Sequence, residues 1–114
     1  MDDKFEQFEM DIMNRIIAED SSISYLLNKQ YKSAIVSQRN FTGAGFFTDF
    51  EVTDKSLAIP DYLDLQLGKV NARIEGLAFG AGFILFIEDG LIAMLEGYTY
   101  GEPWPTPLTA YTIE

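Results

Sequence analysis

Residues 83–95 constrain the fold more than any other segment, because they predict a β-hairpin. Two apolar runs, Phe83–Ile87 and Leu91–Leu95, flank the turn residues Glu88-Asp89-Gly90. An Asp-Gly turn suits a hairpin, since its central residues take positive φ, which glycine adopts freely and aspartate tolerates. Both runs are apolar on both faces, so we expect the hairpin in the middle of a sheet. N-terminal helices would cover one face, and the C-terminal segment or a second copy of the chain would cover the other.

The rest of the chain predicts two helices followed by short strands. Residues 3–19 carry apolar side chains at helical spacing, and a second helix of about 10 residues follows Asp20-Ser21-Ser22. Residues 53–67 are irregular and contain Pro60, which predicts a loop or an edge segment. The remaining strands are expected at residues 34–39, 45–52, 69–76 and 108–113. We predict one α+β domain over residues 1–114, with two N-terminal helices packed on an antiparallel meander sheet of about five strands.

The 114 residues include neither cysteine nor histidine. This excludes disulfides, thiolate nucleophiles, and zinc sites built on sulfur or imidazole. Ser-His-Asp and Cys-His arrangements are excluded as well, because both need imidazole to carry the proton. Carboxylate, tyrosine or lysine chemistry remains, but the spacing of the acids does not match a calcium-binding loop. We therefore expect no cofactor and no metal.

Two further absences bear on where the protein works. No apolar run reaches the roughly 18 residues that a membrane-spanning helix requires. The first residues lack the basic start and apolar stretch of a secretory signal. The sequence therefore predicts a cytoplasmic protein that does not enter a membrane.

The net charge of −10 comes from 18 acidic and 8 basic residues. Such a charge opposes binding to nucleic acid and to anionic membrane surfaces, both of which need lysine and arginine. It favours a basic protein partner, although solubility alone is an alternative explanation. No basic residue follows Arg73, so the later acids would form a partner surface if they shared one face. These acids are Glu75, Glu88, Asp89, Glu96, Glu102 and Glu114.

Two short words recur along the chain. Gly43-Ala44-Gly45-Phe46 reappears as Gly80-Ala81-Gly82-Phe83, and neither copy completes a phosphate-binding motif, which favours strand starts with a bend or bulge. The segment from Glu75 to Gly80 resembles the one from Glu96 to Gly101. Paired in space, Glu75 and Glu96 could support glycosidase-type acid/base work at about 5–10 Å separation. The alternative is a repeated turn with solvated glutamates.

Aromatic residues gather near the C-terminus among prolines and glycines. Tyr98, Tyr100 and Trp104 lie close to Glu102, and Tyr111 follows. Aromatic side chains on a stiff backbone are good recognition anchors, because binding costs them little entropy. The alternative is that they plug the open end of the sheet. The candidate binding residues are Glu75, Glu96, Tyr98, Tyr100, Glu102 and Trp104.

Two sequence blocks resemble a group of small acidic bacterial proteins of unknown function. One block spans residues 41–48, Phe-Thr-Gly-Ala-Gly-Phe-Phe-Thr. The other runs from Gly82-Phe83 through Leu95-Glu96-Gly97-Tyr98 to Pro103-Trp104-Pro105. The resemblance covers residues 34–105 and leaves the N-terminal helices unmatched. It implies no catalytic residues.

These observations together favour a non-enzymatic domain that binds another protein. A basic partner, neutralised in the manner of an immunity or inhibitor protein, fits the acidic charge. The alternative is a small carboxylate-based enzyme or carbohydrate-binding module that uses Glu75 and Glu96. A third interpretation is a homodimer formed through the apolar hairpin.

Overall fold

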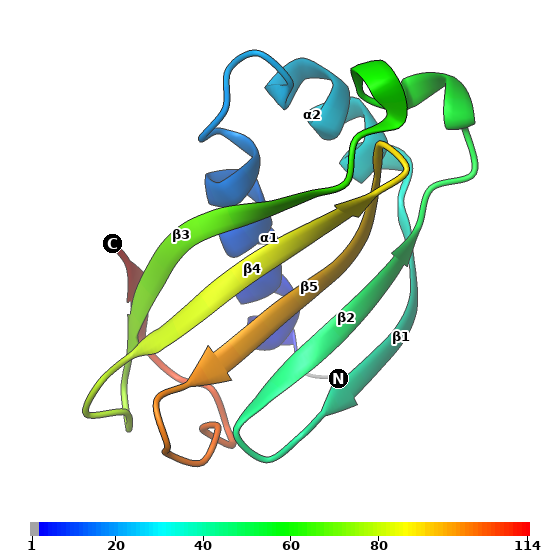
Figure 1. Cartoon of the computed structure of the whole chain (residues 1–114). Coiled ribbons are helices and arrows are strands. Elements are labelled where there is room, and N and C mark those ends of the chain that lie inside the picture. Colours follow the sequence, from blue (N-terminus) through cyan, green and yellow to red (C-terminus); the bar gives the residue numbers. More distant parts are fainter. Residues whose placement is uncertain (1–2) are drawn as a thin grey trace.

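The computed structural model describes residues 3–114 as two α-helices, two short 3₁₀ turns and six strands (Figure 1). The first half holds α1 (Asp3–Ile17), α2 (Ser24–Ser33), β1 (Ile35–Phe41) and β2 (Gly45–Glu51). The 3₁₀ turns Lys55–Leu57 and Pro60–Tyr62 lead into β3 (Leu65–Ile74), β4 (Ala81–Glu88) and β5 (Leu91–Thr99). The last strand is β6 (Tyr111–Ile113). The predicted α+β class is confirmed, with one more strand than expected.

All six strands form one sheet in the order β1-β2-β5-β4-β3-β6, and each neighbouring pair is antiparallel. The β4–β5 hairpin lies at the centre, as its two apolar runs predict. The meander β3-β4-β5 therefore joins the β1-β2 hairpin through the pairing of β2 with β5. A connection over residues 52–64 carries the chain from one side of the sheet to the other (Figure 1).

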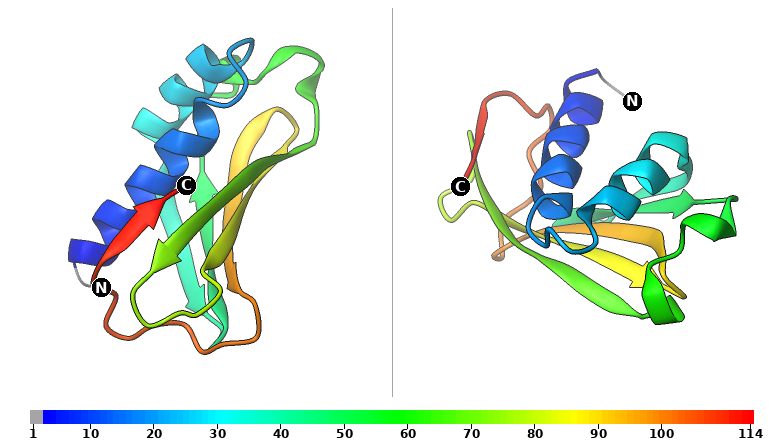
Figure 2. Two further views of the ribbon diagram at one scale, coloured as in Figure 1. Left: turned by 90° about the vertical axis from the view of Figure 1, so that its left-hand side faces the viewer. Right: turned by 90° about the horizontal axis from the view of Figure 1, so that it is seen from above.

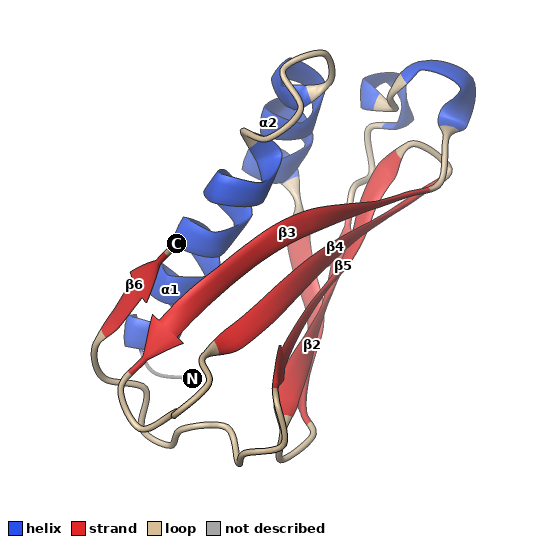
Figure 3. Ribbon diagram, turned by 60° about the vertical axis from the view of Figure 1, so that its left-hand side comes forward, coloured by secondary structure: helices blue, strands red, loops and turns tan. Residues whose placement is uncertain are grey.

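Both helices pack on the same face of the sheet (Figure 2). We call this the inner face and the opposite one the open face. The C-terminal segment does not cover the open face, so that expectation is wrong. Residues 100–110 run round the end of the sheet to the helix side, where β6 pairs with β3 (Figure 3). The uncovered middle of the open face is the main architectural feature of the molecule.

The core lies between the helices and the inner face. The apolar stripe of α1 is buried along its whole length, as its spacing predicts, at Phe5, Phe8, Ile12, Met13, Ile16 and Ile17. Trp104 lies in this core with only 7% of its surface exposed. Its ring centroid is 5.2 Å from that of Phe46 and 6.1 Å from that of Phe8. The Trp104 side chain therefore serves mainly to pack the core and is not an exposed recognition anchor.

One polar side chain fixes α2 to the centre of the sheet. Gln30 is fully buried, and its Nε2 donates to the carbonyls of Leu57 and Gly90, both at 2.9 Å. Its Oε1 accepts from the Ile92 N–H at 2.7 Å. The Gly90 carbonyl also accepts from the Ile59 N–H at 3.0 Å, whereas the Leu57 carbonyl and the Ile92 N–H would each carry a desolvation cost of about 1–3 kcal/mol without Gln30. Gln30 thus holds α2 and the first 3₁₀ turn on the β4–β5 turn.

Strand β3 begins at Leu65, which lies inside the segment expected to be irregular. The register shifts between Leu67 and Val70, at Gly68, whose φ is +120°. A Cβ at Gly68 would lie 2.5 Å from the Phe83 carbonyl oxygen. This bulge changes which face the side chains point to, so the two halves of β3 do not share one alternation. The sequence pattern therefore revealed only the second half.

We expect Trp104→Ala to lower the free energy of unfolding by about 3–5 kcal/mol, because it leaves a large cavity among packed aromatic rings. Phe79→Ala is the matched control, since the Phe79 side chain is 72% exposed, and it should change stability little. Urea unfolding followed by circular dichroism measures both. Equal effects of the two substitutions would contradict the core position of Trp104.

Tyr31 in α2 and Tyr111 in β6 have raised pKa values. Burial, reinforced by the charge of Glu9, raises the pKa of Tyr31 to about 12. Burial, followed by a hydrogen bond to Asp11, raises the pKa of Tyr111 to about 12. The Tyr111 hydroxyl donates to Asp11 Oδ2 at 2.6 Å and so ties β6 to α1.

We expect stability to fall as pH rises through the alkaline range. Both tyrosines have folded pKa values near 12, above the ordinary value of 10, so the native state favours their protonated forms. Their contribution is complete below pH 10 and is lost as pH rises to about 12. Urea unfolding at a series of pH values should show a shallower loss for Tyr31→Phe and for Tyr111→Phe. Slopes equal to the wild-type slope would contradict this assignment.

Candidate functional site

The strand registers arrange the open face in three rows across the sheet. Residues directly opposite each other in antiparallel strands share a face. The first row holds Gln38, Asp49, Met94, Phe86 and Gln66. The second holds Asn40, Phe47, Glu96 and Ile84. The third holds Gly45, Tyr98, Gly82 and Asn71.

The open face carries apolar side chains together with two carboxylates. Its apolar side chains are half-buried against one another rather than fully exposed, and they are Phe47, Ile84, Phe86, Met94 and Tyr98. Asp49 and Glu96 lie among them as diagonal neighbours on β2 and β5, about 7–8 Å apart between Cα atoms. The two ion pairs among residues 3–114 are Glu9–Arg39 and Arg73–Glu114. Asp49 and Glu96 therefore have no described cationic partner.

Glycines shape both faces of the central hairpin. A Cβ at Gly82 would lie 2.6 Å from the Tyr98 ring, which crosses it on the open face. A Cβ at Gly97 would lie 2.3 Å from the Phe46 ring on the inner face. The recurring Gly-Ala-Gly-Phe segments thus lead into β2 and β4, with Gly43 and Gly80 at positive φ in the bends and Gly45 and Gly82 where a Cβ would clash with the Gly97 carbonyl and the Tyr98 ring. This confirms the structural explanation of the repeats.

Two tyrosines extend the open face toward the end of the sheet. Tyr98 and Tyr100 have ring centroids 5.7 Å apart, and the Tyr100 hydroxyl donates to Asn71 Oδ1 at 2.8 Å. Burial, followed by the neighbouring Tyr100 and Glu96 side chains, raises the pKa of Tyr98. Tyr98 therefore stays a neutral hydroxyl at physiological pH. Tyr100, which is 50% exposed, keeps the accessibility that its candidate binding role requires.

The structure does not bring Glu75 and Glu96 together. Ala72 of β3 pairs with Ala81 of β4, and Ala81 pairs with Thr99 of β5. Glu75 follows Ala72 by three positions, whereas Glu96 precedes Thr99 by three on a strand that runs in the same direction. The two residues thus lie on the order of 20 Å apart along the strands. The carboxylate pair needed for glycosidase-type chemistry is not formed.

The acids after Arg73 do not share one face either. Glu88 and Asp89 lie at the β4–β5 turn, at the far end of the sheet from the β3–β4 turn that holds Glu75. Glu114 pairs with Arg73 at 3.4 Å. The Glu102 carboxylate accepts from the Ala78 and Phe79 N–H groups at 2.9 and 3.1 Å, so it anchors the β3–β4 loop. Of this set, only Glu96 lies in the rows of the open face.

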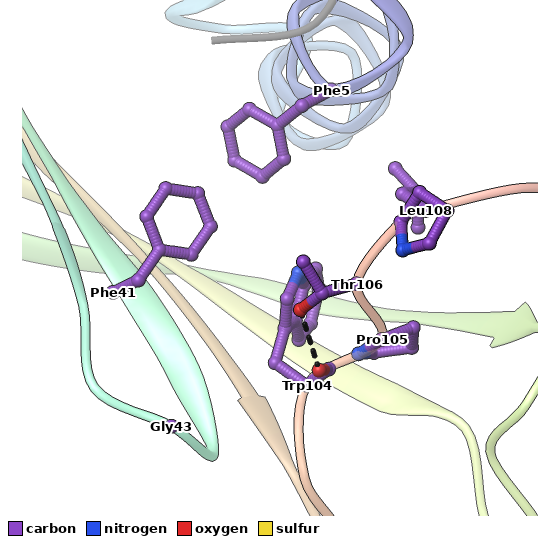
Figure 4. Close-up of a pocket in the computed structure, with 8 residues that line it drawn as sticks. Phe5, Phe41, Gly43, Trp104, Pro105, Thr106 and Leu108 are labelled. Carbon is purple, nitrogen blue, oxygen red and sulfur yellow. Dashed lines mark hydrogen bonds between the residues drawn. The ribbon is translucent and has the colours of Figure 1, made fainter.

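The aromatic and proline tail forms a hollow at the end of the sheet, with a volume of about 390 Å³ (Figure 4). Its walls come from α1, β1, the β1–β2 turn and the tail, at Phe5, Phe41, Gly43, Trp104, Pro105, Thr106, Pro107 and Leu108. The backbone N–H of Trp104 donates to the Gly43 carbonyl at 2.7 Å. This hydrogen bond holds the tail against the β1–β2 turn. Phe41 remains 44% exposed at the mouth of the hollow.

A buried charge network lies beside this hollow and was not expected. Glu9 is only 3% exposed, and it accepts from Arg39 Nη2 at 2.7 Å and from Thr48 Oγ1 at 2.6 Å. The hydrogen bond with Glu9 raises the pKa of Arg39. The signal that could have revealed the network is a glutamate on the apolar stripe of α1, four residues after Phe5. The network joins α1 to the edge strand β1.

We expect Arg39→Ala to lower the free energy of unfolding by about 3 kcal/mol or more, because it leaves the Glu9 charge buried without a partner. Arg73→Ala is the control, since the Arg73 side chain is 80% exposed and its ion pair should contribute little. Denaturant unfolding at neutral pH compares the two variants. A small loss for Arg39→Ala would show that Glu9 reaches water in solution.

Comparison with protein-family models, with curated proteins and with solved structures gives no match for this chain. Within residues 3–114, no helix is long and apolar enough to cross a membrane. The same residues contain no group of three or more acidic side chains placed to hold a metal ion.

Proposed function

We propose that the chain is a non-enzymatic protein-binding domain and that a basic protein docks on its open face. The observation that supports this proposal is the mixed chemistry of the three rows. Half-buried apolar side chains surround Asp49 and Glu96, two carboxylates without a described cation. Apolar and aromatic side chains typically make the centre of a protein interface, and a complementary charge sets the choice of partner.

The charge of the whole molecule supports the same choice. A net charge of −10 attracts a cationic partner over a distance and raises the rate of encounter at low salt. A lysine or arginine that reaches Asp49 and Glu96 would gain two carboxylates at once. If the bound surface is the working surface of the partner, docking neutralises that partner, as an inhibitor or immunity protein does.

The other interpretations have less support. A carboxylate-based enzyme or carbohydrate-binding module loses its geometric basis, because Glu75 and Glu96 are far apart. Self-association through the central hairpin would bring two chains of net charge −10 together, with Asp49 and Glu96 of each copy on the contacting face. Like charges at such a contact oppose association.

Two double variants with equal loss of charge test the proposal. Asp49→Asn with Glu96→Gln removes the open-face carboxylates, and Glu19→Gln with Glu75→Gln removes two exposed carboxylates elsewhere. Wild type and both variants are immobilised, exposed to extract of the source cell at low and moderate salt, and analysed by quantitative mass spectrometry. We expect wild type and the Glu19/Glu75 variant to retain the same basic protein, and added salt to weaken its retention. The Asp49/Glu96 variant should lose it.

Equal retention by the two double variants would contradict the proposal, because it would show that net charge alone draws the retained protein. Retention of no basic protein by wild type would contradict it as well. Circular dichroism of each variant confirms that the fold is intact.

A further inference from the structure

The edge strand β1 carries features that the open-face proposal does not use. We infer that β1 accepts an extended segment of a protein partner as an additional antiparallel strand, with one apolar side chain of that segment in the hollow beside Phe41. This surface is separate from the open face, and the inference stands or fails independently of the proposed function.

The free backbone groups of β1 follow from its pairing with β2. The Thr42 N–H donates to the Gly45 carbonyl at 3.0 Å, which makes Thr42 and Gly45 a hydrogen-bonded pair. Pairs alternate in an antiparallel ladder, so Phe41 and Arg39 belong to non-hydrogen-bonded pairs. Their N–H and C=O groups point away from β2. Among residues 3–114, no described hydrogen bond outside the ladder involves the backbone N–H or C=O groups of Arg39 or Phe41.

Strand β1 has two devices that protect sheet edges, the inward-pointing Arg39 and a bulge, but it lacks the others. Such edges usually carry proline, outward lysine or a very short strand. The other edge strand, β6, has only three residues, whereas β1 has seven and contains neither proline nor lysine. Its one charged residue, Arg39, turns inward to Glu9. A bulge interrupts the strand between Val36 and Gln38, which leaves the stretch from Gln38 to Phe41 regular and next to the hollow.

Backbone pairing alone does not select a sequence, but the hollow would favour a segment with an apolar side chain at one position. Phe41 pairs with the buried Phe46, so a strand added at β1 would direct the side chain opposite Phe41 to the same face, toward the hollow. The Phe5, Phe41, Trp104 and Leu108 side chains surround this space (Figure 4). An apolar side chain of the added segment would fill this space and contact the rings that surround it.

Charge decides which segment can bind there. A second copy of this chain would bring another net charge of −10 to the same edge. In the furrow between α1 and β1 the acids Glu6 and Glu9 balance the bases Lys32 and Arg39, and no lining residue of the hollow is charged, so the net charge of the chain sets the preference. A neutral or basic extended segment therefore fits better than an acidic one. Recognition of this kind derives affinity from main-chain bonds and specificity from pockets for alternate side chains.

The test uses a displayed library of random linear peptides, selected on the immobilised full chain, and one selected sequence made as a synthetic peptide. Amide hydrogen exchange followed by NMR should show that the peptide slows exchange at Arg39 and Phe41. Exchange at Gln38 and Asn40, which already bond to β2, should not change. We expect Phe41→Ala to weaken peptide binding at least about tenfold. The control Phe47→Ala, on the open face, and the Asp49→Asn/Glu96→Gln variant should bind as wild type.

Three results would overturn the inference. Selection could give no binding peptide. The selected peptide could slow exchange elsewhere and lose affinity with Phe47→Ala. The Arg39 and Phe41 amides could already be protected in the free chain to a degree that rises with protein concentration, which would place a second copy at the edge. Thermal unfolding of Phe41→Ala and Phe47→Ala confirms that each variant is folded.

Discussion

The packing of one phenylalanine ring, that of Phe46, connects the elements on the inner face of the sheet. Phe46 is fully buried and lies over Gly97, where a Cβ would be 2.3 Å from its ring. Its ring centroid is 4.9 Å from that of Phe5 on α1 and 5.2 Å from that of Trp104 in the tail. The ring therefore joins the sheet, the first helix and the C-terminal segment at one point. A side chain at position 97 would displace it, and all three contacts would have to change.

That concentration of apolar contacts on one side leaves the other side of the sheet uncovered. The helices and the tail all lie on the inner face, so the outer side chains of β2, β4 and β5 can pack only on one another. Such a face is half-buried, and it holds two carboxylates close to aromatic rings. The two proposals divide the remaining surface between them. The open face offers charge and apolar area, whereas the edge strand β1 offers backbone hydrogen bonds and one apolar hollow.

Local patterns predicted the elements whose rules are local. The α1 stripe, the Asp-Gly hairpin and the bends of the glycine segments were interpreted correctly, because helical spacing, turn geometry and the positive φ of Gly43 and Gly80 are properties of a few consecutive residues. The start of β3 was missed because the bulge at Gly68 interrupts its alternation. The strand order depends on the pairing of β2 with β5, which no local pattern encodes. For the same reason, the sequence could not show that Glu75 lies far from Glu96. Nor could it show that Asp49 is the neighbour of Glu96 on the open face. The Glu9 network needed a long-range partner, Arg39, and only the polar residue on the apolar stripe hinted at it.

The central claim is that the open face meets water in the isolated chain, and methyl NMR with a soluble paramagnetic agent tests it most directly. Met94 lies on the open face, Met13 is fully buried, and Met10 is 46% exposed. We expect the agent to broaden the Met94 and Met10 methyl signals and to leave the Met13 signal sharp. A Met94 signal as protected as that of Met13 would show that the open face is covered in solution, and it would contradict the account.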